Sequence, residues 1–187
     1  MTTKRHGDSL ERVAAEVRVC PLCRLTKTRK NAVPGEGPRS AKIMFIGEAP
    51  GRSEDENGRP FVGTAGRILD DLLKKVGIER SEVFITNIVK CRPPHNRVPE
   101  EDEIAACNSY LNRQTGLIKP EVICILGRTA YSSLLGGSSI TANRGKILVW
   151  ANQKYFLTFH PAAAIYNKTI LSTLEADLKK LAIEVDK

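Results

Sequence analysis

Short apolar runs alternate with segments of helical periodicity along most of this chain, and this alternation restricts the fold more than any other feature. The apolar runs predict strands at residues 42–46, 83–87, 121–126, 146–150 and 154–159. Apolar spacing, helix-starting residues and glycine stops predict helices at residues 65–76, from Pro99 onward, at 129–135 and at 167–185. Strands that alternate with helices favour parallel βαβ units with helices on both faces of a sheet. We therefore expect an α/β fold.

Polar residues follow three of the expected strands at the point where each strand ends. Glu48 comes just after the first strand, Asn87 ends the second, and His160 ends the last. In open α/β sheets, ligands bind outside the carboxyl ends of the strands. The sequence therefore predicts that Glu48, Asn87 and His160 meet in one crevice.

The chain is basic, with 29 Lys and Arg against 21 Asp and Glu in 187 residues. The formal charge of +8 favours a polyanionic partner such as nucleic acid. The length suits one domain with one core. Residues 1–17 read as a polar lead-in and a short amphipathic helix without the apolar segment of a secretory signal. Because no apolar run approaches the roughly 18 residues of a membrane span, we expect a cytosolic protein with no membrane partner.

Four of the five cysteines form a pattern typical of a metal site. Cys20 and Cys23 are separated by two residues, and Cys91 and Cys107 follow much later. Disulfides explain these thiols poorly in a chain without a secretory signal. A four-thiolate site fits better, and the spacing alone allows either zinc or an iron–sulfur cluster. Cys124 lies inside an apolar run and is expected in the core.

Two active-site motifs, 47–51 (GEAPG) and 160–164 (HPAAA), occur together with these cysteines. The further matching positions are Glu54, 60–63 (PFVG), 86–87 (TN) and 90–94 (KCRPP). On these residues the chain closely resembles the family 4 uracil-DNA glycosylases, the thermostable bacterial and archaeal type, from Cys20 to its end. The resemblance implies a single domain over residues 1–187, a three-layer α/β/α sandwich with a central four-stranded parallel sheet. It also implies a [4Fe–4S] cluster that staples residues 1–40, held by Cys20, Cys23, Cys91 and Cys107.

The resemblance also implies a reaction. Uracil would be flipped out of DNA and its N-glycosidic bond hydrolysed, which leaves an abasic site and initiates base excision repair. Phe61 resembles the aromatic residue that stacks on uracil, and Asn87 resembles the residue that reads its edge. An asparagine amide can accept from N3–H and donate to O4 at once, and cytosine offers the opposite pattern. His160 resembles the histidine that stabilises charge on the departing base, a role open to a neutral imidazole.

Two acids and two backbone segments complete the expected pocket. Glu48 resembles an acid that orients the attacking water and favours a cationic sugar, and Glu54 resembles a second acid of the uracil pocket. The backbone at Ala49 and Pro50 is expected to line the uracil as well. Other uracil glycosylase families carry an aspartate where Ala49 stands, so the residue that activates water stays open. None of the residues assigned to the pocket is a lysine, and we expect a monofunctional hydrolase without Schiff-base lyase chemistry.

DNA contacts are expected from loops around the crevice. Basic side chains would hold phosphates, which position the DNA without reading its sequence, and the candidates are Arg92, Arg97, Arg128, Arg144 and Lys146. Ile165 or Tyr166 would push into the space that the base leaves. We expect a monomer that acts on single- or double-stranded uracil-containing DNA in the prokaryotic cytosol or nucleoid. A sliding-clamp contact is not readable from the sequence.

Three other interpretations stay open. A related group captures uracil-DNA covalently through a histidine on an inserted basic loop, and His95 lies near the corresponding stretch. Against this, the chain lacks the insertion and has Glu48-Ala49-Pro50 at the place where that group has a segment resembling Glu-Gln-Pro. A zinc-stapled nucleic-acid-binding module without catalysis would explain the charge and the cysteines but not the polar strand ends. An electron carrier fits a full α/β domain with a polar crevice poorly.

Overall fold

The computed structural model describes residues 7–185, and at its centre is a five-stranded sheet in the order β2-β1-β3-β5-β4. The strands are β1 (Ile43–Gly47), β2 (Phe84–Asn87), β3 (Val122–Leu126), β4 (Ile147–Trp150) and β5 (Gln153–Thr158). Neighbours β2, β1, β3 and β5 are parallel, whereas β4 pairs antiparallel with β5 at the edge. The expected α/β fold with four parallel strands is confirmed, and the β4–β5 hairpin adds a fifth strand.

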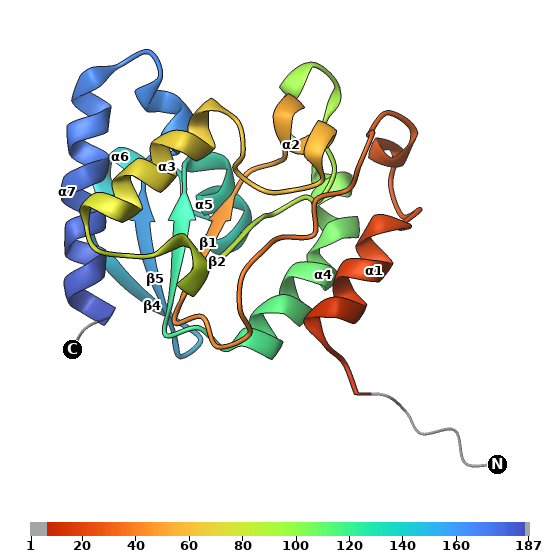
Figure 1. Ribbon diagram of the computed structural model, residues 1–187, viewed down its shortest axis with the longest axis horizontal. Coiled ribbons are helices and arrows are strands. Elements are labelled where there is room, and N and C mark those ends of the chain that lie inside the picture. The colour runs from red at the N-terminus through yellow and green to blue at the C-terminus, as the bar shows by residue number, and fades with distance from the viewer. Residues whose placement is uncertain (1–6, 186–187) are drawn as a thin grey trace.

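Helices cover both faces of the sheet (Figure 1). They are α1 (Leu10–Arg18), α2 (Arg52–Asn57), α3 (Thr64–Lys75), α4 (Glu101–Ile118), α5 (Arg128–Leu135), α6 (Ile140–Asn143) and α7 (Lys168–Val185). The acidic first turn of α4 forms a capping box, in which the Glu103 side chain accepts from the main-chain N–H of Glu100. The short acidic α2 was not expected from the sequence. Residues 1–6 and 186–187 of the expected domain lie outside the described residues.

The central strands are buried on both faces, since every residue of β1, β2 and β3 is buried. Phe45 and Cys124 pack with α3 and α7 on one face. Met44 and Ile123 pack with α4 and α5 on the other face. Parallel strands that are covered on both sides need apolar residues at successive positions, which is why the runs were visible in the sequence. Cys124 lies in this core as expected.

The N-terminal segment forms an additional layer outside α4. Helix α1 packs on α4, and Val13 and Val17 share an apolar cluster with three of the buried cysteines. In the ribbon view, α1 and α4 lie side by side (Figure 1). Over residues 7–185, no helix combines the length and apolar character that a membrane crossing requires.

The order of the strands determines where a site can form. The chain runs from β1 outward to β2 and then crosses back to β3 on the other side of β1. This reversal creates a crevice outside the carboxyl ends of the strands. Glu48 directly follows β1, Asn87 ends β2, and His160 lies two residues after β5.

Candidate active site

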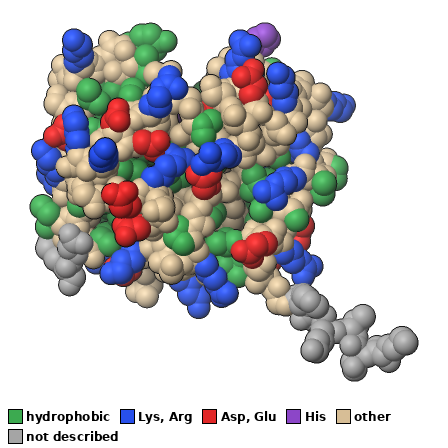
Figure 2. Space-filling view, viewed as in Figure 1, with side chains coloured by type: hydrophobic (Ala, Val, Ile, Leu, Met, Phe, Trp, Pro, Cys, Tyr) green, Lys and Arg blue, Asp and Glu red, His purple; other side chains and the backbone are tan. Residues whose placement is uncertain are grey.

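A cavity of about 370 Å³ opens at the carboxyl edge of the sheet. Its walls include all seven residues expected in the pocket: Glu48, Ala49, Pro50, Glu54, Phe61, Asn87 and His160. Sequence analysis did not assign pocket positions to the others, which are Gly51, Ala65, Pro93, Asn96, Arg97 and Ala162. The space-filling view shows a notch between two lobes of the molecule, with Lys and Arg side chains on both sides (Figure 2).

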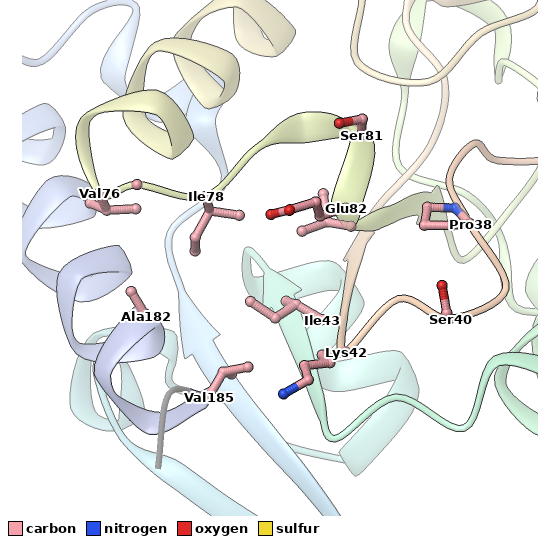
Figure 3. A pocket seen from close by; sticks show the side chains of 12 residues that line it. Pro38, Ser40, Lys42, Ile43, Val76, Ile78, Ser81, Glu82, Ala182 and Val185 are labelled. Carbon is pink, nitrogen blue, oxygen red and sulfur yellow. The ribbon is translucent and has the colours of Figure 1, made fainter.

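A second cavity, of about 540 Å³, lies at the opposite edge of the sheet (Figure 3). Ile43 at the start of β1, Val83 just before β2 and Val185 at the end of α7 line it. Its charged lining residues are Lys42 and Glu82. Because it contains none of the motif residues and lies away from the switch point, the smaller cavity is the candidate active site.

Phe61 is held in an unusual backbone conformation beside the cavity. Its φ is +50°, a left-handed value that is rare for a bulky residue. The Arg80 guanidinium donates to the carbonyl oxygens of Pro60 at 2.7 Å and Phe61 at 3.3 Å, which stabilises this turn. The Phe61 ring is buried, and its centroid lies 5.5 Å from that of the His160 imidazole. The two rings therefore border the same space.

Asn87 carries a buried polar atom that the protein does not satisfy. The residue is 1% exposed, and its Oδ1 has no hydrogen-bond partner among the described residues. Asn87 is paired in register with Gly47 on β1, so the two strand ends meet at the cavity. A buried acceptor without a donor destabilises a fold by about 1–3 kcal/mol. The amide is therefore placed to take a hydrogen bond from a ligand.

His160 is held as a neutral imidazole. Its Nδ1 accepts from the main-chain N–H of Ala162 at 3.1 Å, which places the proton of the neutral ring on Nε2. Burial lowers the pKa of His160 to about 4, and the Glu54 carboxylate opposes this only in part. At neutral pH the ring can donate one hydrogen bond from Nε2 without carrying a charge.

The two acids of the pocket have different surroundings. The Glu54 carboxylate accepts from the N–H groups of Gly51 at 3.1 Å, Val62 at 2.9 Å and Gly63 at 2.8 Å. It thereby ties the start of α2 to the loop that follows Phe61. Glu48 is half-buried and lines the cavity. Sequence analysis placed both acids in the uracil pocket, and the contacts show that Glu54 also stabilises the main chain around it.

The four patterned cysteines come together beside α1 and α4. Cys20, Cys91 and Cys107 are buried and Cys23 is half-buried, and all four line one small cavity. Three of the sulfurs accept hydrogen bonds. The Arg29 guanidinium donates to Cys91 at 3.0 Å, and main-chain N–H groups donate to Cys107 at 3.2 Å and to Cys20 at 3.5 Å. Within residues 7–185, no group of three or more His, Cys, Asp or Glu side chains is placed to hold one metal ion. The four thiols thus share one cavity.

Lys90 belongs to one of the matched motifs, yet sequence analysis assigned it no role. The residue is 1% exposed, and burial lowers the pKa of its ammonium group to about 8. It follows Ile88 and Val89, both buried, and precedes Cys91. The position of a lysine inside such an apolar segment was the sequence signal that could have identified Lys90 as a buried, hydrogen-bonded residue.

The basic residues expected at DNA differ in whether their charges are already paired with acids of the protein. Arg97 donates to both carboxylate oxygens of Glu103, at 2.8 and 2.6 Å, and Arg144 pairs similarly with Asp177. Both acids are fully buried, so these arginines neutralise interior charges. Arg128 is exposed at the start of α5.

The remaining expected DNA contacts lie at the surface. Arg92 donates to Asn96 Oδ1 at 2.7 Å, and Lys146 donates to the carbonyl of Ala142 at 2.8 Å. Just past His160, Ile165 is 40% exposed and Tyr166 is 93% exposed. Two large apolar or aromatic side chains thus project from the loop before α7.

The fold and the cavity define a protein of the uracil-DNA glycosylase superfamily, whose family model, "Uracil DNA glycosylase superfamily", matches residues 34–182. The chain is 54% identical to a type-4 uracil-DNA glycosylase of Sulfurisphaera tokodaii over 93% of its own length and 84% of that protein. It is 52% identical to the one from Saccharolobus solfataricus, over 93% and 85% of the two chains. The one from Archaeoglobus fulgidus is 42% identical, over 93% and 92%. The chain belongs to the type-4 uracil-DNA glycosylases.

Proposed function

We propose that this protein removes uracil from DNA by hydrolysing its N-glycosidic bond, leaving an abasic site at which base excision repair begins. The observation that carries this proposal is the buried Oδ1 of Asn87, which has no hydrogen-bond partner within residues 7–185 and belongs to a residue of the cavity that Phe61 and His160 also line. Uracil offers an N3–H donor to this oxygen and a flat face to the Phe61 ring. Cytosine has an acceptor at N3, which would meet another acceptor. The base must leave the DNA stack to reach this site.

His160 stabilises the leaving group. When the bond between N1 and C1′ breaks, the electron pair remains on uracil and its negative charge spreads to O2. The Nε2–H of the neutral imidazole donates a hydrogen bond to that oxygen, and it does so most strongly when the charge has developed. The anion takes its proton from water after release. The sugar left behind is cationic at C1′.

We assign the role on the sugar side to Glu48. Glu48 lines the cavity, whereas the Glu54 carboxylate, which lines it too, is bound to three main-chain N–H groups. It favours the cationic sugar and accepts a proton from the water that forms the new bond to C1′. Ala49 offers no second carboxylate here. Lys90 directs its ammonium group to three oxygens of the protein, so no lysine chemistry is proposed and the enzyme is monofunctional.

We further propose that the DNA crosses the notch in Figure 2. Arg92, Arg128 and Lys146 would hold phosphates, while Arg97 and Arg144 serve mainly to pair buried acids. Tyr166, with Ile165, would fill the space that the flipped base leaves. In this proposal the protein is a single domain that acts as a monomer on uracil-containing DNA in the cytosol or nucleoid. Removal of the Arg128 charge should reduce the salt dependence of DNA binding by about one phosphate contact.

The cysteine set fits a [4Fe–4S] cluster, and we propose Cys20, Cys23, Cys91 and Cys107 as its ligands. All four thiols line one small cavity beside α1 and α4, and Cys20, Cys91 and Cys107 are buried. The N–H donors to three of the sulfurs suit thiolates. When bound, the cluster would supply a covalent staple between the N-terminal segment, the loop after β2 and α4.

The test is to incubate the protein with an oligonucleotide that contains one uracil and then add alkali. Strand cleavage above that of thymine and cytosine controls is expected, and its absence would overturn the proposed function. Asn87→Ala should lose most activity while it keeps the absorbance near 400 nm that the cluster gives. A DNA-linked band on a denaturing gel would instead indicate covalent capture. His95 is the candidate for that reaction, although it is not among the residues that line the cavity.

A further inference from the structure

Lys90 lies between the uracil cavity and the cysteines, and it is held by an unusual set of contacts. Its Nζ donates to Thr86 Oγ1 at 2.5 Å, to the main-chain carbonyl of Asn87 at 2.8 Å and to Gln114 Oε1 at 2.8 Å. An ammonium group has three protons, so these contacts use all of them. None of the three acceptors is a carboxylate. An ion pair within this set therefore does not explain why a lysine is buried here.

The acceptors are themselves fixed to other parts of the fold. Thr86 Oγ1 donates to the carbonyl of Pro34 at 3.0 Å, and Gln114 Nε2 donates to the same carbonyl at 2.7 Å. The network thus joins β2, α4 and the segment that precedes β1. A buried polar network in which every member is satisfied makes its surroundings rigid.

The orientation of the Asn87 amide depends on this network. Its Oδ1 has no hydrogen-bond partner among the described residues, so no bond from the protein to that oxygen orients the amide. The position of the amide is instead set by the main chain at Asn87, whose carbonyl Lys90 holds. We propose that Lys90 is a positioning residue of the uracil site, which holds the main chain of Asn87 so that its amide faces the base. This inference rests on the proposed function.

The same residue connects the site to the cysteines. The main-chain N–H of Lys90 donates to the sulfur of Cys107 at 3.2 Å, and Cys91 is the next residue. Residues 87–91 therefore carry the base reader, its anchor and one cysteine of the set on a single short stretch of chain. A side chain that merely filled space here would not need three donated protons.

The experiment is a double-mutant cycle between Lys90→Met and Asn87→Ala, read by single-turnover excision with enzyme in excess. Lys90→Met keeps much of the side-chain length and removes the protons. If Lys90 acts through Asn87, the substitution should slow excision about 10- to 100-fold in the wild-type background and less than about threefold in the Asn87→Ala background. Affinity for the abasic product, which has no base to read, should be unchanged. Thr115→Val removes a hydroxyl from the next residue after Gln114 on α4 and should leave excision unchanged.

Equal losses in both backgrounds, or a matching loss of affinity for abasic DNA, would overturn the role of Lys90 and leave the proposed function intact. A wild-type protein that releases no uracil would overturn both. If Lys90→Met does not fold or loses its absorbance near 400 nm, Gln114→Met replaces it, because this change removes one acceptor and leaves the contact with Asn87. It should slow excision about 3- to 10-fold, again only when Asn87 is present. Persistence of that loss in Asn87→Ala would contradict the proposal.

Discussion

Substitution of Gly47 by alanine tests the geometry of the pocket with a single carbon atom. A Cβ at this position would lie 2.5 Å from Asn87 Oδ1 and 2.7 Å from Cζ of Phe61. Gly47 does not have a left-handed φ, so an alanine is allowed by the backbone and only the contacts oppose it. To reach 3.4 Å, where ordinary contact begins, the gap to Asn87 must open by about 0.9 Å and that to Phe61 by about 0.7 Å.

These displacements fall on the two side chains proposed to hold uracil. A misplacement of about 1 Å in a catalytic site can reduce the rate about 100-fold, so kcat/KM of Gly47→Ala should fall by about that factor. Overpacking of the buried site should also reduce the free energy of unfolding by about 1–3 kcal/mol. The assay is excision from a uracil-containing oligonucleotide at a temperature where thermal unfolding shows the variant to be folded.

Gly116 provides the matched control. It lies in the last turn of α4, and an added Cβ would meet nothing within 4 Å. Gly116→Ala should therefore keep full activity and raise the free energy of unfolding by about 0.5–1 kcal/mol, because alanine favours the helix. The reasoning is refuted if folded Gly47→Ala excises uracil within about threefold of the wild-type rate. In that case Asn87 and Phe61 would not be the residues that hold the base.

Three further predictions separate chemistry from structure. Glu48→Gln should lower kcat about 100-fold or more without changing the melting temperature. Glu54→Gln should reduce the free energy of unfolding by about 1–3 kcal/mol, because the Glu54 carboxylate accepts three main-chain N–H groups. The reverse pattern in calorimetry and kinetics would contradict this assignment. Burial lowers the pKa of His160 from 6.5 to about 4, so on acidification the unfolded chain takes up the proton first and stability should decline between about pH 6.5 and 4. His160→Gln should flatten this part of the pH profile of thermal unfolding, and an unchanged profile would argue against a buried neutral ring. Cys107→Ser should abolish absorbance near 400 nm and Cys124→Ala should retain it; equal loss in both would exclude the proposed ligand set.

The architecture was predictable because the sheet is buried on both faces. Strands β1, β2 and β3 need apolar side chains at successive positions, and these runs stand out against their polar flanks. Helix α2 was missed because its residues 52–57 (RSEDEN) include no apolar side chain to give a periodic signal. Its start is held instead by Glu54, which accepts from the N–H of Gly51. The edge strand β4 was visible as a run but lay outside the four-stranded sheet that the resemblance implied.

The site was predictable in its membership and not in its contacts. Strand ends carry Glu48, Asn87 and His160 to one edge of the sheet, and sheet topology alone requires this. The bond between Arg144 and Asp177 joins residues 33 positions apart, and no local pattern indicates that it exists. The bond between Lys90 and Gln114 likewise joins residues 24 positions apart and depends on where α4 packs. Sequence patterns therefore identify which residues line the cavity, while packing decides which of their polar groups are already bound to other parts of the protein.

The charge state of His160 constrains the mechanism. The reaction creates a cation at the sugar and an anion on the base within a few ångströms, and a protonated imidazole would favour the anion but oppose the cation. A neutral ring with its proton on Nε2 supports the anion through one hydrogen bond and adds no net charge. Of the two carboxylates that line the cavity, that of Glu54 is bound to three main-chain N–H groups, so in the proposed mechanism Glu48 is the one that acts on the sugar. The proposed mechanism therefore needs one catalytic carboxylate in its ionised form together with a neutral histidine.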